Sequence, residues 1–240
     1  MHLPVKPLAA IFVALCLIRE IRNGYFQRIP AYLPSIDWRP FLGISLFTAL
    51  AFGCLIPADA VLAGWVCGRQ SSLARAISDY GGIMGKGANP WCFLGAVYTL
   101  ALFLKRKRWL RASFGCLLSS AIASVATLLL KLVFLRARPV TGEGPLSFFN
   151  LEGWGRKANL FYSLPSGDVA VVAGAAAYLF YRVKNTALRA LLMLLPVLTA
   201  FSRVYKSKHW PSDTAFAVGL ALLAALFVVH YERFASPKKV

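Results

Sequence analysis

A histidine and an aspartate lie four residues apart in the segment SRVYKSKHWPSD, residues 202–213. An aspartate this close to a histidine can hold one ring nitrogen and leave the other nitrogen free to act as a nucleophile. Pro211, between His209 and Asp213, predicts that a helix begins there, so the pair need not share a helical turn. Arg203 precedes the pair and can bind an anion. For His209 alone, a structural hydrogen-bonding role is the plainer alternative.

Two cations lie in a second segment, KLVFLRARP, residues 131–139. A separation of seven residues on a helix places Lys131 and Arg138 on one face, where both can bind the same anion. Pro139 disfavours helix at the residue that precedes it. For this segment by itself, the simpler interpretation is that the two side chains extend from the end of an apolar helix to the membrane surface and have no binding role.

A third polar group, PSGD at residues 165–168, immediately precedes a long apolar segment. We expect a helix to begin here, and the unpaired N–H groups of a helix start attract an anion. The Ser166 hydroxyl and the N–H of Gly167 can act as donors to that anion, or Ser166 can simply cap the helix. Asp168 in the first turn suits the helix dipole without any further function.

The elements between these polar groups are strongly apolar. The chain has 240 residues, of which 58% are hydrophobic, and a mean hydropathy of +0.62, above that of typical soluble domains. We therefore predict an all-α integral membrane protein, a bundle of six transmembrane helices. The predicted spans are residues 41–67, 90–104, 113–135, 167–183, 187–201 and 212–230.

Two places depart from the simple pattern of spans and loops. The first span contains Pro57 and Asp59, so we expect it to end near them and to continue as a surface element. Residues 72–80 predict a short amphipathic helix that lies at the membrane interface, and we expect Gly81 and Gly82 to close it.

The charge of the chain is one-sided, with 27 lysines and arginines against 9 acidic residues and a net charge of +18. The cations form short runs between apolar segments, which is typical of membrane proteins, so nucleic acid is not an expected partner. The larger share lies in residues 1–40, in KRKRWLR at 105–111 and in the other loops on that side. The positive-inside rule places this side and both termini in the cytoplasm. We divide the chain into a basic, partly apolar N-terminal segment (1–40), cytoplasmic or interfacial, and a membrane domain (41–240).

This topology brings all three polar groups to the outer face of the membrane. Lys131, Arg138 and Arg203 supply fixed positive charge. The helix start at Ser166 supplies hydrogen-bond donors, and His209 supplies a nucleophile. Such a set can hold a phosphoryl group and attack it.

The pattern K-x6-RP, PSG and SR-x5-H-x3-D, from Lys131 to Asp213, resembles the three-part signature of the type 2 phosphatidic acid phosphatase superfamily of lipid phosphatases. The spacing inside each motif agrees with that of the family signature, and the predicted six-helix layout is similar to that of the membrane members of the family. The resemblance covers the last four predicted spans and leaves residues 1–40 outside it.

The resemblance implies a double displacement that needs neither metal nor cofactor. His209 would attack phosphorus to give a phosphohistidine, Asp213 would orient His209, and water would hydrolyse the intermediate. The residues that would bind the phosphoryl oxygens are Lys131, Arg138, Ser166, Gly167 and Arg203. The family usually has PSGH, whose histidine protonates the leaving group. Here that position is Asp168, which would have to serve as the acid.

The resemblance also implies a phospholipid or glycolipid substrate, with the active site facing the periplasm from a bacterial inner membrane. Similarity to small bacterial lipid A phosphatases, together with the basic outer surface, favours a phosphate of lipid A, followed by undecaprenyl diphosphate and phosphatidate-type lipids. The alternative of a non-catalytic binder or transporter of anionic lipids remains, because Asp168 replaces the usual acid histidine. The presence of His209 and Asp213 favours an enzyme. A halide-oxidising enzyme that holds vanadate shares the residue pattern, but those relatives are soluble.

Overall fold

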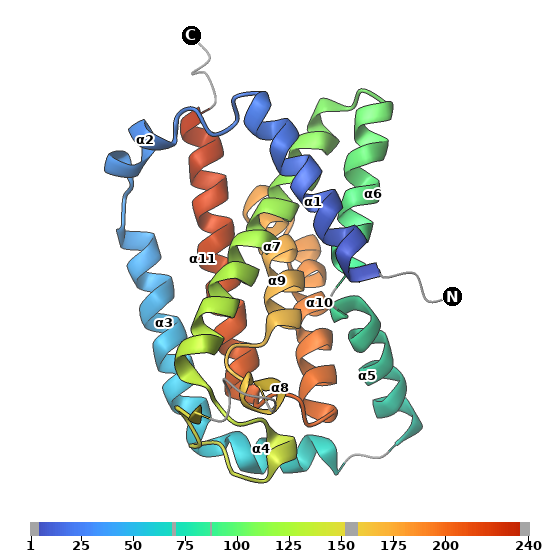
Figure 1. Cartoon of the computed structure of the whole chain (residues 1–240), viewed down its shortest axis with the longest axis vertical. Coiled ribbons are helices and arrows are strands. Elements are labelled where there is room, and N and C mark those ends of the chain that lie inside the picture. Colours follow the sequence, from blue (N-terminus) through green and yellow to red (C-terminus); the bar gives the residue numbers. More distant parts are fainter. Residues whose placement is uncertain (1–4, 69–70, 87, 152–157, 236–240) are drawn as a thin grey trace.

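The computed structural model describes residues 5–68, 71–86, 88–151 and 158–235 (Figure 1). Every regular element in these ranges is a helix, which confirms the predicted all-α class. The α-helices are α1 (Val5–Arg22), α2 (Ile29–Tyr32), α3 (Arg39–Leu55), α4 (Asp59–Cys67), α5 (Ser72–Gly85), α6 (Asn89–Phe103), α7 (Lys107–Phe134), α8 (Ala158–Phe161), α9 (Gly167–Arg182), α10 (Thr186–Tyr205) and α11 (Pro211–Ala235). Three short 3-10 turns are η1 (Leu33–Ser35), η2 (Ile56–Ala58) and η3 (Pro139–Thr141).

Within the described ranges, four helical segments are long and apolar enough to cross a membrane. They are Arg39–Cys67, Lys107–Thr141, Thr186–Tyr205 and Pro211–Ala235. Helix α6 is apolar but shorter, and α9 has 16 residues, about 24 Å at 1.5 Å per residue. A helical membrane protein is therefore confirmed, and the count of six spans stays a prediction.

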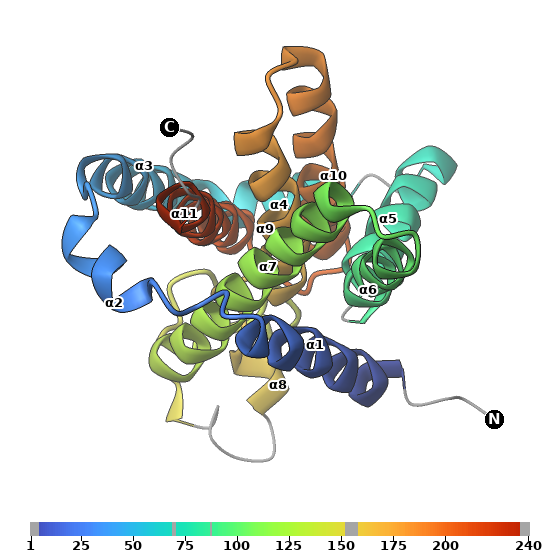
Figure 2. The ribbon, with the colours of Figure 1, turned by 90° about the horizontal axis from the view of Figure 1, so that it is seen from above.

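Helix α9 lies in the middle of the bundle and contacts α7, α10 and α11 (Figure 2). Its buried side chains are mainly alanine and valine, which allow the neighbouring helices to approach closely. At Gly174 a Cβ atom would lie 2.8 Å from Cα of Ser120 in α7, so only glycine permits this crossing. The apolar surface of α9 is thus covered by protein.

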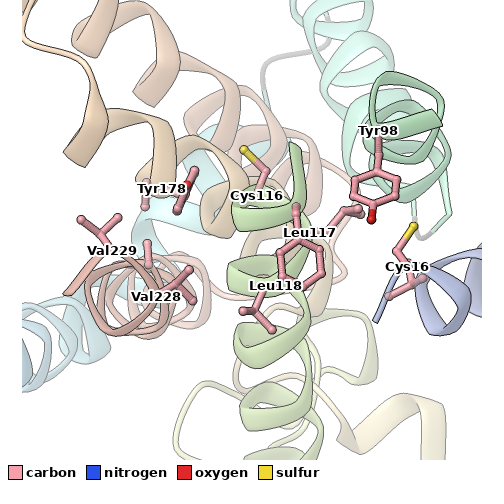
Figure 3. Close-up of a cluster of buried hydrophobic side chains, with 12 residues drawn as sticks. Cys16, Tyr98, Cys116, Leu117, Leu118, Tyr178, Val228 and Val229 are labelled. Atoms are coloured by element: carbon pink, nitrogen blue, oxygen red, sulfur yellow. The ribbon is translucent and has the colours of Figure 1, made fainter. Parts of the chain in front are cut away.

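A cluster of buried side chains joins the N-terminal helix to the rest of the bundle (Figure 3). Cys16 of α1 and Tyr98 of α6 belong to the same cluster as Leu117 of α7, Tyr178 of α9 and Val228 of α11. Helix α1 therefore packs on the bundle, although the resemblance to the family leaves it outside.

The first predicted span bends where the sequence predicts a break. Helix α3 ends at Leu55, η2 contains Pro57, and α4 then runs across the lower end of the bundle in Figure 1. The bend brings Asp59, the first residue of α4, into the interior, where it is fully buried.

The amphipathic helix at residues 72–80 is longer than predicted. The prediction that Gly81 and Gly82 close it is wrong, because α5 continues through both glycines to Gly85. The three glycines are buried against α10, and a Cβ atom at Gly81 would lie only 2.7 Å from the carbonyl carbon of Leu198. The glycines therefore serve close helix packing rather than helix termination. The placement of α5 at a membrane interface stays a prediction.

Candidate active site

The three polar segments predicted from the sequence meet at one end of the bundle, the lower end in Figure 1. Backbone hydrogen bonds tie them together. The N–H of Ser166 donates to the carbonyl of Asp213 over 3.2 Å, and the N–H of Val140 donates to the carbonyl of Ser207 over 3.2 Å. The N–H of Ser163 donates to the carbonyl of Arg136 over 3.1 Å. Loops from three parts of the sequence thus form a single site.

Lys131 and Arg138 do not share a helical face, so this expectation is wrong. Helix α7 ends at Phe134, Leu135 adopts a left-handed conformation (φ 41°, ψ 45°), and Arg138 is extended (φ −79°, ψ 156°) before Pro139. Pro139 accounts for the extended backbone of Arg138, but the helix has already ended four residues earlier, at Phe134. The two cations nevertheless lie close enough to interact electrostatically with each other and with Asp213.

Helix α9 begins at Gly167, as predicted, with Ser166 as the residue before it. The Ser166 side chain makes no capping hydrogen bond, so the alternative that it is a plain helix cap is wrong. Its buried hydroxyl has no hydrogen-bond partner among the described residues. Lys131 lies beside this helix start, with its Cε 3.9 Å from the position of a Cβ on Gly167, and its Nζ donates to the carbonyl of Tyr162 over 2.5 Å.

Arg203 occupies the last turn of α10 and faces the start of α9. Its Nη1 forms an ion pair with Asp168 Oδ2 at 3.0 Å, and its Nη2 donates to the carbonyl of Gly82 in α5 over 3.1 Å. The buried Nε atoms of Arg203 and Arg138 have no partner among the residues that the structure describes. Donors that are left unpaired inside a protein are costly unless a ligand satisfies them.

His209 lies in the turn between α10 and α11 and is only 3% exposed. Its Nδ1 is 2.7 Å from the carbonyl oxygen of Ser163. Because a carbonyl can only accept, Nδ1 carries the proton and Nε2 keeps its lone pair. Burial lowers the pKa of His209 to about 4, and the nearby cations Lys131 and Arg138 act in the same direction. The imidazole is therefore neutral at pH 7 and can act as a nucleophile.

Asp213 lies beside His209, but its carboxylate is not the nearest acceptor. Oδ2 is 3.8 Å from Nδ1 of His209, which is longer than a hydrogen bond. Instead Oδ2 accepts from the Ser163 hydroxyl at 2.5 Å and from the N–H of Trp210 at 2.8 Å. Helix α11 begins at Pro211, as predicted, so His209 and Asp213 do not share a helical turn.

Four polar residues of the site were not among the predicted site residues: Asp59, which was noted only as a break in the first span, Arg136, Ser163 and Ser212. Arg136 and Asp59 are both fully buried, and Arg136 Nη2 lies 2.7 Å from Asp59 Oδ2. Arg136 Nη1 also pairs with Asp213 Oδ1 at 2.5 Å. The signals in the sequence were an aspartate inside an apolar segment and a second arginine two residues before Arg138.

The arrangement combines a buried neutral imidazole with unpaired donors and with guanidinium and ammonium groups around one helix start. Such a combination can bind a tetrahedral oxyanion and attack its central atom.

Comparisons with known proteins agree with this chemistry. The model of the PAP2 superfamily matches residues 110–236. The decaprenylphosphoryl-5-phosphoribose phosphatase of Mycobacterium tuberculosis is 30% identical over 155 residues, which cover 65% of this chain and 76% of the relative.

Two crystal structures have a similar fold. The first transmembrane PAP2 type phosphatidylglycerolphosphate phosphatase from Bacillus subtilis has a TM-score of 0.63 and 19% identity, covering 85% of this chain and 100% of its own. Aquifex aeolicus LpxE has a TM-score of 0.55 and 19% identity, covering 72% of this chain and 94% of its own. The matched family model includes all three polar segments of the site, and the protein is therefore a member of the PAP2 superfamily.

Proposed function

We propose that this protein is a membrane phosphatase that removes a phosphate from a lipid headgroup through a phosphohistidine on His209. The observation that carries the proposal is the set of buried, unpaired donors, Ser166 Oγ, Arg138 Nε and Arg203 Nε, around a neutral histidine. Membership of the PAP2 superfamily and the phosphatase named among the relatives support it.

The proposed reaction has two steps. Nε2 of His209 attacks phosphorus while the bond from phosphorus to the leaving oxygen breaks, and water then attacks the phosphohistidine to release phosphate and regenerate the imidazole. In both steps the phosphoryl oxygens are bound by Lys131, Arg138, Arg203, the Ser166 hydroxyl and the N–H of Gly167. Because these groups already neutralise the phosphoryl charge, we propose that the reaction needs no divalent metal.

Asp168 takes the position where the family usually has a histidine, and its carboxylate pairs with Arg203 at 3.0 Å. A carboxylate in an ion pair with arginine carries no proton to donate. We therefore infer that the leaving oxygen departs with little protonation from Asp168 at neutral pH. This favours substrates with stable leaving groups, such as sugar 1-phosphates and diphosphates.

For the substrate, we propose a phosphate on a sugar or diphosphate carried by a membrane lipid, with lipid A as the first candidate. The basic outer loops suit a glycolipid with several negative charges. The second candidate is a polyprenyl-linked phosphate, such as undecaprenyl diphosphate or a polyprenylphosphoryl sugar phosphate. It is favoured by the relative named for decaprenylphosphoryl-5-phosphoribose. The distribution of lysine and arginine supports a bacterial inner membrane with the site on the periplasmic side.

The experiment measures phosphate release by the purified protein from lipid A, undecaprenyl diphosphate, phosphatidylglycerophosphate and phosphatidate, with and without EDTA. We expect turnover that EDTA does not change, and trapping of ³²P on the protein in an acid-labile, base-stable form. His209→Ala should abolish both signals, and His230→Ala is the matched control because His230 lies in α11 and belongs to no part of the site.

Three results would contradict the proposal. Equal turnover by His209→Ala and the parent would exclude the phosphohistidine. Loss of activity in EDTA that magnesium restores would exclude a metal-free site. Lipid binding without turnover, unaffected by His209→Ala, would instead indicate a binder or transporter.

A further inference from the structure

At the candidate site, a fully buried arginine joins two carboxylates from distant parts of the chain. Arg136 Nη2 pairs with Asp59 Oδ2 at 2.7 Å and Nη1 pairs with Asp213 Oδ1 at 2.5 Å. The guanidinium carbon lies 4.9 Å from the ring centre of Phe148, so aromatic side chains surround the charge. None of these three charged side chains is exposed.

The charges of this group depend on one another. Burial of a charged group is costly unless a partner of opposite charge and sufficient hydrogen bonds compensate for it. Arg136 is the shared partner of Asp59 and Asp213, so its loss would leave two buried carboxylates facing each other. The loss of Asp59 alone would leave a balanced pair of Arg136 and Asp213.

Ser163 connects the three charged residues to His209, because its hydroxyl, its N–H and its carbonyl each form a hydrogen bond in this group. The Ser163 hydroxyl donates to Asp213 Oδ2 over 2.5 Å, and its N–H donates to the carbonyl of Arg136 over 3.1 Å. Its carbonyl then accepts the Nδ1 proton of His209 over 2.7 Å. The position of that carbonyl, and with it the direction of Nε2, is set by Asp213 and by the backbone of Arg136.

Asp59 connects the same group to helix α11. Its Oδ1 accepts from the N–H of Ser212 at 2.8 Å and its Oδ2 accepts from the Ser212 hydroxyl at 2.5 Å. Ser212 also accepts a hydrogen bond from Arg136 Nη1 over 2.8 Å. The bend after α3 thus places one carboxylate at the start of α11, beside Asp213, which explains an aspartate inside an otherwise apolar segment.

We infer that Arg136 and Asp59 are positioning residues for the nucleophile: they hold Asp213 and Ser163 so that His209 keeps its proton on Nδ1 and directs Nε2 at phosphorus. The inference rests on the proposed role of His209. Both side chains are fully buried and neither is among the proposed phosphoryl ligands, so both should act on turnover rather than on substrate binding.

The first test compares Arg136→Gln, Asp59→Asn and the double variant in phosphate release from the substrate that the parent prefers. We expect Arg136→Gln to lower kcat about 100-fold, since a displacement of about 1 Å can cost this much. KM should stay within about threefold, because Lys131, Arg138 and Arg203 are intact. Asp59→Asn should cost about tenfold, and the double variant should be faster than Arg136→Gln because it lacks one of the two unpaired carboxylates.

Arg182→Gln is the matched control. It removes an arginine ion pair with Glu232 (3.1 Å) at the opposite end of α9 and should leave kcat and KM unchanged. If Arg136→Gln does not fold, the kcat of Asp59→Asn against that of the parent gives the test, with thermal unfolding recorded for each variant. Unchanged kcat in Asp59→Asn, or a double variant no faster than Arg136→Gln, would overturn the inference.

A second measurement does not depend on turnover. The chain has 3 histidines, so ¹⁵N-histidine labelling resolves the tautomer of His209 by NMR. We expect the Nδ1–H form in the parent and a mixture of both tautomers in Arg136→Gln. An unchanged tautomer in that variant would overturn the positioning role. A parent that turns over no lipid but shows this tautomer change would refute the proposed phosphatase and leave the positioning role standing.

Discussion

At the scale of single residues, the proposed function makes Asp168 the residue that decides which leaving groups the site can serve. Its carboxylate pairs with Arg203 at 3.0 Å, and in the proposed function it would compete with substrate for this cation. A histidine at this position would carry a proton near neutral pH and would release Arg203.

We predict that the parent hydrolyses diphosphates and glycosyl phosphates much faster than phosphatidate at pH 7. Asp168→His should narrow this gap, because the new imidazolium can protonate the alkoxide of phosphatidate. The measurement is the ratio of kcat/KM for the two substrate types in parent and variant. Equal rates on both types by the parent, or an equal slowing of every substrate by Asp168→His, would contradict the prediction.

A second prediction at this scale concerns the titration of His209. Burial lowers its pKa to about 4, from an ordinary value of about 6.5, because the imidazolium is poorly solvated there. The proposed nucleophile is the neutral form of His209, so its protonation should not reduce activity between pH 7 and pH 5, and should do so only as the pH falls towards 4. NMR titration of ¹⁵N-labelled histidine measures this without interference from the titration of the substrate phosphate. A midpoint above pH 6 for His209 would show that burial does not control its charge.

At the scale of elements, a backbone carbonyl of helix α5 holds the Arg203 side chain in place. The carbonyl of Gly82 accepts from Arg203 Nη2 over 3.1 Å, and Lys206 Nζ lies 2.9 Å from Asp79 Oδ1. Close packing of α5 on α10 depends on Gly81, where a Cβ atom would lie 2.7 Å from the carbonyl carbon of Leu198.

We therefore predict that Gly81→Ala lowers the melting temperature in detergent, consistent with an overpacking cost of about 1–3 kcal/mol. It should also reduce phosphate release, because α5 is pushed away from α10 and Gly82 no longer positions Arg203. Gly64→Ala in α4 is the matched control, since a Cβ atom there meets nothing within 4 Å. It should be neutral or slightly stabilising, through the better helix propensity of alanine. If both variants behave alike, the close approach of α5 does not matter to the site.

At the scale of the whole molecule, the basic loops predict that the site lies on the outer side of the membrane. Glu143 lies in the loop after η3, next to the site, and Lys184 lies between α9 and α10 at the other end; both are exposed. In a cysteine-free background, a membrane-impermeant maleimide should label Glu143→Cys in intact spheroplasts and Lys184→Cys only after lysis. Labelling of Lys184→Cys in intact spheroplasts would reverse the predicted topology.

The sequence by itself determined the class of the fold and most of the phosphoryl-binding candidates. Apolar segments of membrane length can only be helices, because a backbone without water must satisfy its own hydrogen bonds. Short motifs also carry their chemistry in residue type and spacing, so Lys131, Ser166, Arg203 and His209 could be named without coordinates. The helix starts at Gly167 and Pro211 followed from local signals in the same way.

Only the tertiary structure decided how these residues support one another. The end of α7 at Phe134 and the continuation of α5 through Gly81 depend on packing and on the neighbouring backbone, which override the local pattern. Arg136 and Asp59 are 77 residues apart and carry no motif of their own, so nothing local predicts that they pair. They pair because the bend after α3 and the end of α7 bury both charges in one place, where a charge without a partner of opposite sign would be costly.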